Sequence, residues 1–183
     1  MGNQNTTRRE FLKRSGAVTA AAATGLAGFP AIVRGQSGPI KIGVLHPVTG
    51  PLAYSGGLSR LGAQIAIEEI NTAGGIKSLG GAKIETVLGD AQSKPEVGVS
   101  EVEKMNSEGV SAVVGAYASA ICLATTQAAA KYNIPHVVDV GVADQIVERG
   151  LKNTFRFAPG YRTVSQQAMN YLHIMNTLAI KPA

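Results

Sequence analysis

The sequence contains no tryptophan, a single cysteine and three histidines, and aromatic residues make up 5% of its 183 residues. The lone cysteine, Cys122, excludes a disulfide within the chain, and its apolar neighbours indicate a small buried side chain rather than a reactive thiol. His46, His136 and His173 lie too far apart to follow the spacing of metal ligands. No basic patch is interleaved with aromatic residues, which argues against a nucleic-acid partner. We therefore expect no metal, no cofactor and no nucleic acid.

Motifs of the common enzyme classes are also missing. There is no Gly-x-Ser-x-Gly elbow, no His-Glu-x-x-His, no P-loop and no Gly-x-Gly-x-x-Gly after a predicted strand. Asp90 and Asp139 each end a predicted strand, but neither is accompanied by a base or a nucleophile, so we interpret them as polar loop residues. His136 lies within a predicted strand and is interpreted as a core residue, while His46 is a weak candidate for a ligand contact. The sequence predicts a protein that is not an enzyme.

The N-terminus has the features of an export signal. Arg8 and Arg9 stand just ahead of a run over 15–33 that is mostly Ala, Gly, Thr and Val. A charged start before a modest apolar run is typical of a secretory leader, and paired arginines indicate the twin-arginine route. The alternative is a membrane anchor, which we rank lower because Ala, Gly and Thr favour insertion less than Leu, Ile or Phe. We expect 1–36 to be a cleaved signal and 37–183 the periplasmic part. A lipid anchor is not expected, because no cysteine stands directly after the cleavage site.

The charge of the chain supports this division. The sequence holds 17 Lys and Arg against 12 Asp and Glu, a net charge of +5. Five of the basic residues and one acidic residue belong to the predicted signal, which leaves 12 against 11, or +1. The basic excess is therefore a property of targeting and gives no sign of an acidic partner.

Short apolar runs then alternate with segments of helical periodicity. Strands are predicted at 40–45, 83–88, 111–115, 135–140 and 154–157, and helices at 58–71, 95–108, 121–132 and 163–178. This alternation predicts an α/β fold with a parallel, doubly wound sheet covered on both faces. Such sheets bind ligands beyond the carboxyl ends of their strands, near the point where strand order reverses.

Three loops at that predicted edge are small, rich in glycine and supplied with hydroxyls. They cover 47–57 after the first strand, 115–119 after the third and 140–143 after the fourth. Ser119 stands just before a predicted helix, whose free N–H groups attract a carboxylate or another anion. Ser119 is therefore either a plain helix cap or part of a ligand site, and its position beside Tyr117 at this edge favours the site.

A family resemblance appears once these segments are compared in order. Lys41-Ile42-Gly43-Val44-Leu45, followed by Thr49-Gly50-Pro51 and Ser55-Gly56, resembles the opening of the branched-chain amino-acid binding proteins, which have the type I periplasmic binding fold. The later segments that agree are Glu68-Glu69-Ile70-Asn71, Gly74-Gly75-Ile76, Gly115-Ala116 through Ser119, Ile134-Pro135, Arg156 and Gly160. The resemblance implies two lobes that close on a small ligand and present it to an ABC permease in the inner membrane. We expect this chain to hold the first lobe, with the second absent after Lys181-Pro182.

The resemblance also implies which residues line the cleft: Tyr54, Ser55, Tyr117, Ala118, Ser119, Val140, Gly141 and Val142. Ser119 corresponds to the family serine that meets the ligand carboxylate. Val142 stands where binders of α-amino acids commonly have threonine, and the missing hydroxyl would cost an ammonium about 1–3 kcal/mol. This departure favours a ligand without an α-amino group, such as an aromatic or aliphatic carboxylate, an amide or a urea-like solute, with branched-chain amino acids as the family default.

The expected function is solute capture. The resemblance implies a monomeric periplasmic protein, exported by the twin-arginine machinery, that delivers its ligand to the permease of an ABC importer. The alternative is the ligand-sensing domain of a receptor or a regulatory system, since the same fold serves both. The cleavable signal favours a free periplasmic protein.

Overall fold

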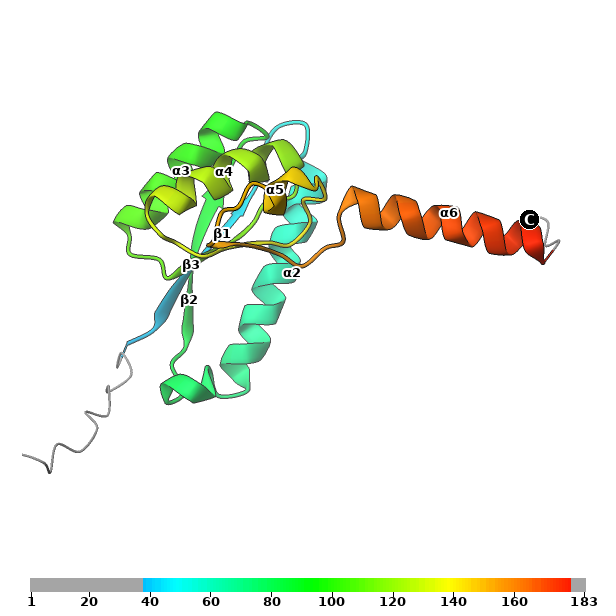
Figure 1. The fold of residues 1–183 in the computed structure, drawn as a ribbon. Coiled ribbons are helices and arrows are strands. Elements are labelled where there is room, and N and C mark those ends of the chain that lie inside the picture. Colours follow the sequence, from blue (N-terminus) through cyan, green and yellow to red (C-terminus); the bar gives the residue numbers. More distant parts are fainter. Residues whose placement is uncertain (1–37, 179–183) are drawn as a thin grey trace, which may run out of the picture. The chain divides into compact units, whose positions relative to one another are not determined.

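Five parallel strands form one sheet in the computed structural model, which describes residues 38–178 (Figure 1). The strands are β1 (Ile40–His46), β2 (Ile84–Asp90), β3 (Ala112–Gly115), β4 (His136–Val138) and β5 (Thr154–Arg156). Their order across the sheet is β2-β1-β3-β4-β5, with every neighbouring pair parallel. The predicted export signal, including Arg8 and Arg9, lies outside the described residues.

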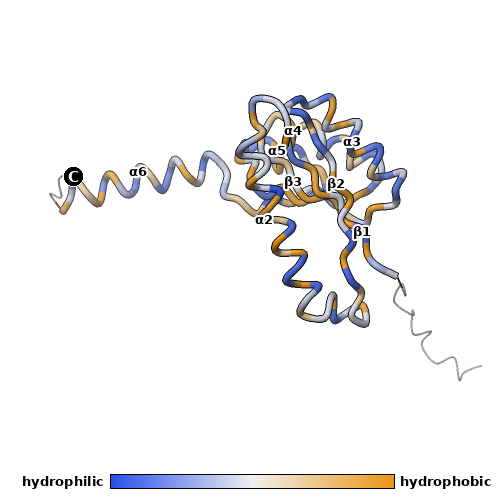
Figure 2. The backbone as a smooth tube through the Cα atoms, turned by 180° about the vertical axis from the view of Figure 1, so that it is seen from behind, coloured by the Kyte–Doolittle hydropathy of each residue, from blue (hydrophilic) through white to orange (hydrophobic). Residues whose placement is uncertain are grey.

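Helices cover both faces of this sheet. The covering helices are α2 (Ala53–Thr72), α3 (Pro95–Ser107), α4 (Ser119–Lys131) and α5 (Gln145–Glu148), with a short 3-10 helix η1 (Lys77–Leu79) before β2. The last helix, α6 (Tyr161–Thr177), has no buried residue and packs on neither face. Figures 1 and 2 show α3, α4 and α5 on one face and α2 on the other. The prediction of a parallel, doubly wound α/β sheet is confirmed. Within the described residues, no helix combines the length and apolar character needed to cross a membrane.

The core lies between the sheet and the layer formed by α3 and α4. Leu45, Met105, Val113, Ile121 and Val138 are almost completely buried there. Burying each of these side chains contributes roughly 1.5–3 kcal/mol. The layer of α3 and α4 therefore covers the main hydrophobic core of the fold.

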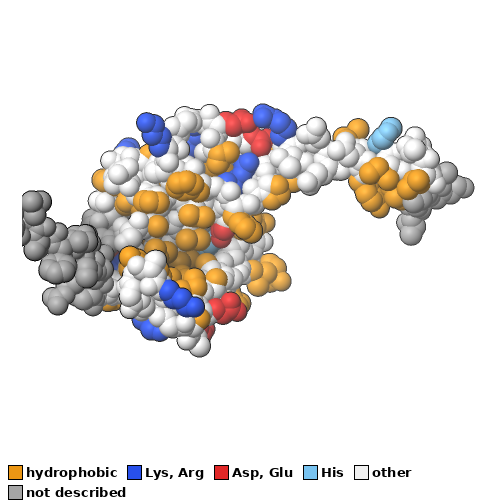
Figure 3. Space-filling view, turned by 60° about the horizontal axis from the view of Figure 1, so that its bottom comes forward, with side chains coloured by type: hydrophobic (Ala, Val, Ile, Leu, Met, Phe, Trp, Pro, Cys, Tyr) orange, Lys and Arg blue, Asp and Glu red, His pale blue; other side chains and the backbone are white. Residues whose placement is uncertain are grey.

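The opposite face of the sheet keeps apolar side chains in contact with solvent. Figure 3 shows hydrophobic side chains gathered over the middle of the molecule when it is turned from the view of Figure 1. The large exposed apolar residues of α2, β2 and β5 are Leu58, Leu61, Ile65, Ile70, Leu88 and Phe155. The single helix α2 therefore leaves this face only partly covered.

The predicted strands are all present, but several boundaries are wrong. Helix α2 begins at Ala53 rather than at residue 58, so Tyr54 and Ser55 lie in its first turn and not in a loop. The glycines at 56 and 57 suggested a loop, yet both are helical. Gly56 packs so closely against Pro47 that the Pro47 carbonyl oxygen leaves no room for a Cβ. Strand β4 ends at Val138, two residues early, and the short helix α5 was not predicted.

Candidate functional site

The order of the strands defines one place where a ligand pocket can open. Strand β1 pairs with β2 on one side and β3 on the other, so the connections after β1 and after β3 run in opposite directions. In doubly wound sheets, ligands bind beyond the carboxyl ends of the strands at such a reversal. The loops after β1, β3 and β4 meet this edge, as the sequence predicted.

The loop after β1 is held in place by Asp90 at the end of β2. Its Oδ1 accepts hydrogen bonds from the backbone N–H groups of Val48 (3.0 Å) and Gln92 (2.8 Å), and its Oδ2 accepts one from the Thr49 hydroxyl (2.7 Å). Partial burial acts to raise the pKa of Asp90, but these hydrogen bonds outweigh it and hold the pKa below its ordinary value. Asp90 is thus a loop anchor, in agreement with its interpretation as a polar loop residue.

Ser119 joins helix α4 to the loop after β4. It is the first residue of the helix, and Ala118 occupies the N-cap position without a side-chain cap. The Ser119 Oγ accepts hydrogen bonds from the backbone N–H groups of Val142 (3.2 Å) and Ala143 (3.1 Å). The interpretation of Ser119 as a plain N-cap is therefore wrong, because its oxygen bonds a different loop.

This arrangement leaves hydrogen-bond donors free at the start of α4. The Ser119 hydroxyl accepts two bonds, and its own hydrogen has no acceptor among the described residues. The first N–H groups of any helix lack partners within the helix, and here no side chain caps them. One hydroxyl donor beside uncapped N–H groups suits a carboxylate, because the helix dipole also favours negative charge there.

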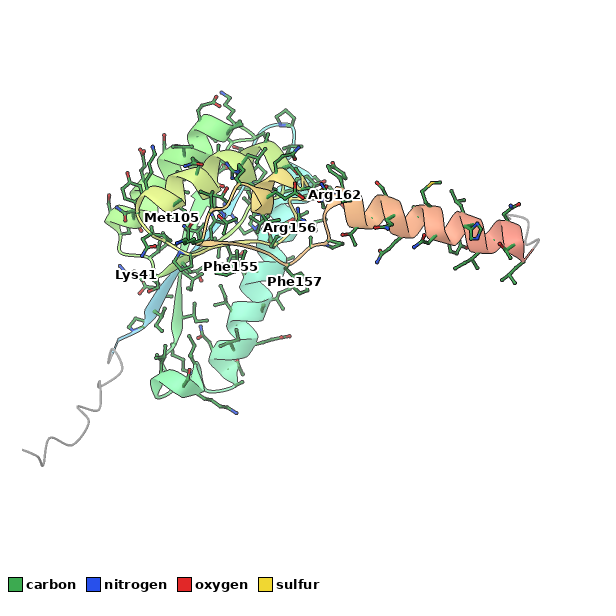
Figure 4. All side chains as sticks on the ribbon, viewed as in Figure 1. Lys41, Met105, Phe155, Arg156, Phe157 and Arg162 are labelled. Atoms are coloured by element: carbon green, nitrogen blue, oxygen red, sulfur yellow. The ribbon has the colours of Figure 1, made fainter. Side chains whose placement is uncertain are left out.

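Arg156 also holds the loop after β4, through the carbonyl oxygens of the same two residues whose N–H groups bond Ser119. Its Nη1 donates to the carbonyl oxygens of Val142 (3.2 Å) and Ala143 (2.8 Å), and its Nη2 lies 3.6 Å from Asp144 Oδ1 (Figure 4). The Val142 carbonyl also accepts a bond from Tyr161 N–H. Both backbone polar groups of Val142 are therefore used within the protein, so only its side chain is available to a ligand.

The remaining predicted residues lie at the same edge with different exposures. Tyr54 is 81% exposed, while Tyr117 and Val140 are partly buried. Gly141 is buried, and a Cβ at this position would lie 2.5 Å from the Cys122 sulfur. Hydrogen bonds connect Ser119 with Val142, whereas none joins Tyr54 or Ser55 to the other predicted residues within the described part of the chain.

A buried pair of ionisable side chains at this edge was not predicted. His46 ends β1 and is fully buried, and its Nε2 lies 3.2 Å from Oδ2 of Asp139, which follows β4. The two side chains are in close contact, but the geometry of this contact is not that of a hydrogen bond. Both residues stand at the carboxyl ends of predicted strands, and this shared position is the feature of the sequence that could have indicated the pair.

His136 is the second buried histidine. Its Nε2 lies 2.9 Å from the Gly115 carbonyl oxygen, and its side chain is fully buried in the core, as predicted. Burial disfavours the charged imidazolium and lowers the pKa of His136 to about 4.

This lowered pKa predicts a loss of stability in mild acid. The unfolded chain takes up a proton at His136 near pH 6.5, whereas the folded protein resists it down to about pH 4. The free energy of unfolding should therefore fall by about 3 kcal/mol between these pH values. Urea unfolding across this range should show the decline in the wild type and a flatter profile in His136→Gln, which keeps a donor for Gly115. Equal slopes in the two proteins would exclude His136 as the cause.

Cys122 is a structural residue. Its thiol donates to the Ala116 carbonyl oxygen at 3.0 Å, and burial raises its pKa to about 11. The prediction of a small buried side chain is confirmed. Residues 38–178 contain no group of three or more His, Cys, Asp or Glu side chains arranged to hold a metal ion.

Comparison with known proteins agrees with this geometry. Residues 39–177 match a family model described as periplasmic binding protein. The chain belongs to the periplasmic binding protein family. The resemblance inferred from the sequence is thereby confirmed, and the family is one of solute-binding proteins.

The names of individual relatives are more specific than the family description. Leu/Ile/Val-binding protein homolog 7 of Brucella abortus is 36% identical over 137 residues, which cover 74% of this chain and 33% of the relative. Leu/Ile/Val-binding protein homolog 1 of the same species is 38% identical over 117 residues, 64% of this chain and 31% of the relative. The solved structure of the branched-chain amino acid transporter substrate-binding protein LivJ from Streptococcus pneumoniae, in complex with isoleucine, is 32% identical with a TM-score of 0.63 and covers 67% of this chain and 34% of its own. The chain thus spans about a third of the length of the curated relatives that it matches.

Proposed function

We propose that this protein is the solute-binding component of an ABC importer that captures a small carboxylate, amide or amino-acid-like ligand. The observation that carries the proposal is the start of α4, where the Ser119 hydroxyl and uncapped helix N–H groups face the edge at which strand order reverses. A ligand carboxylate is the natural partner of such a group of donors. The names of the matched relatives support amino-acid-like ligands.

Export and delivery are part of the same proposal. The paired arginines Arg8 and Arg9 ahead of a small-residue apolar run support twin-arginine export, cleavage near residue 36 and a periplasmic location. In the periplasm, a monomeric binding protein closes on its ligand and presents it to the permease in the inner membrane. Such closure needs a second lobe. The relatives are long enough to contain one, since the match to this chain covers only a third of their length.

A ligand screen of the full-length gene product tests the proposal. Binding to the folded protein raises its melting temperature, with about 2.7 kcal/mol of stabilisation when ligand exceeds Kd a hundredfold. We expect at least one compound from a panel of amino acids, aliphatic and aromatic acids, amides and urea to raise the melting temperature, with micromolar binding in calorimetry. If no compound in the panel binds, the proposed function is wrong.

A further inference from the structure

The start of helix α6 is held by a side chain of another element. The first N–H groups of a helix lack partners within the helix, and the N-cap residue Gly160 has no side chain to supply one. The N–H of Arg162, the second residue of α6, donates instead to Asp144 Oδ2 (3.0 Å). The N–H of Tyr161, the first residue, donates to the Val142 carbonyl oxygen (2.9 Å). Asp144 directly precedes α5, so α6 is capped from a separate helix.

The carboxylate that caps α6 is also held from the side of the sheet. Arg156 ends β5, and its Nη2 lies 3.6 Å from Asp144 Oδ1 (Figure 4). The two side chains are 10% and 21% exposed, so water screens their attraction only in part. Each oxygen of Asp144 therefore has its own partner, the guanidinium for Oδ1 and the N–H of α6 for Oδ2. The helix dipole further favours this negative charge beside the first turn of α6.

Gly160 gives independent support for this arrangement. Its backbone is extended, with φ −75° and ψ 166°, a conformation that is open to any residue. A Cβ at this position, however, would overlap both Asp144 Oδ1 and Arg156 Nη2. The close approach of these two side chains therefore explains why glycine stands before α6.

The remainder of α6 adds little to its attachment. No residue of the helix is buried, and Met169, Tyr171 and Leu172 are among its exposed apolar side chains. Arg162 pairs with Glu148 at 2.8 Å, but the two side chains are 72% and 48% exposed, and such ion pairs contribute little. The direction of α6 therefore depends on the contacts of its first turn.

We propose that Asp144 is a latch that fixes the direction in which α6 leaves the sheet and ties this helix to the loop after β4. The proposal goes beyond the proposed function and does not depend on which ligand the protein binds. Val142 and Ala143, whose N–H groups bond Ser119, directly precede Asp144. One loop thus joins the start of α4 to the start of α6, and the latch is the joint at which a displacement of this loop passes to α6.

The distance between two spin labels on the full-length protein tests the proposal without any ligand. The labels are attached at Glu103→Cys on α3 and Asn170→Cys on α6, both exposed positions. Cys122 does not compete for the label, because it is buried and its pKa is raised to about 11. We expect double electron–electron resonance to give one narrow distance distribution in the labelled parent protein. Asp144→Ala should raise the population at other distances by about tenfold, as expected for the loss of a hydrogen bond to a charged group.

Two further variants separate the latch from a general loss of stability. Gly160→Ala forces Asp144 and Arg156 apart without removing a charge and should broaden the distribution in the same way. Glu148→Gln removes the exposed partner of Arg162 and should leave the distribution unchanged. A distribution in Asp144→Ala as narrow as that of the parent would overturn the proposal, and Gly160→Ala decides in the same way if Asp144→Ala does not fold. A broad distribution in the parent itself would also overturn it, whatever the ligand screen shows for the proposed function.

Discussion

Replacing Ser119 with leucine is expected to abolish the rise in melting temperature that ligand produces in the full-length protein. The bulky side chain would fill the space in front of the first turn of α4 and remove the hydroxyl donor. It would also leave the Val142 and Ala143 N–H groups without their acceptor, at a cost of about 1–3 kcal/mol each where they are buried. Thermal unfolding with and without ligand measures both effects, because the lower melting temperature of the free variant is separate from the lost shift.

The matched control lies on the same helix. Gln127 is exposed near the other end of α4, so Gln127→Leu introduces the same side chain away from the edge. This variant should show the wild-type shift in melting temperature. An unchanged shift in Ser119→Leu would remove Ser119 from the site.

The second large effect is expected at Gly56, the first of two adjacent glycines in α2. A Cβ at Gly56 would overlap the Pro47 carbonyl oxygen, and backbone atoms cannot move aside as a flexible side chain can. We therefore expect Gly56→Ala to lower the free energy of unfolding by about 3 kcal/mol or more. Because this contact also shapes the loop after β1, ligand binding should weaken in the same variant.

Gly57 provides the control for this prediction. A Cβ there meets nothing within 4 Å, so alanine should stabilise the helix by about 0.5–1 kcal/mol. Urea unfolding of the two variants should give changes of opposite sign. Destabilisation of similar size at both positions would show that the close packing of α2 against Pro47 is not the reason for Gly56.

The sheet was predictable because periodicity and composition act locally. The apolar run at 40–45 and the buried run at 111–115 form parallel strands as expected. Their alternation with helices defines the edge at which we propose that the ligand binds. The start of α2 was missed for a tertiary reason. Two adjacent glycines lower the helix propensity of this segment. The need for glycine at position 56 comes from its contact with Pro47, which is distant in the predicted pattern and visible only in the fold.

Side-chain pairing was the part of the site that the sequence did not reveal. Ser119 was assigned to the edge, but its bonds to Val142 and Ala143 depend on how the loop after β4 folds. His46 and Asp139 are separated by 92 intervening positions in the chain and by one strand in the sheet, so each alone has an ordinary structural explanation. Their contact follows from strand order, which periodicity does not give.

The most direct test of the account is a crystal structure of the full-length protein with the tightest ligand from the screen. The account predicts the ligand at the carboxyl ends of β1, β3 and β4, with its carboxylate on the Ser119 hydroxyl and the first N–H groups of α4. A ligand bound elsewhere, with Ser119 and the start of α4 making no contact to it, would contradict the central claim that this edge is the binding site.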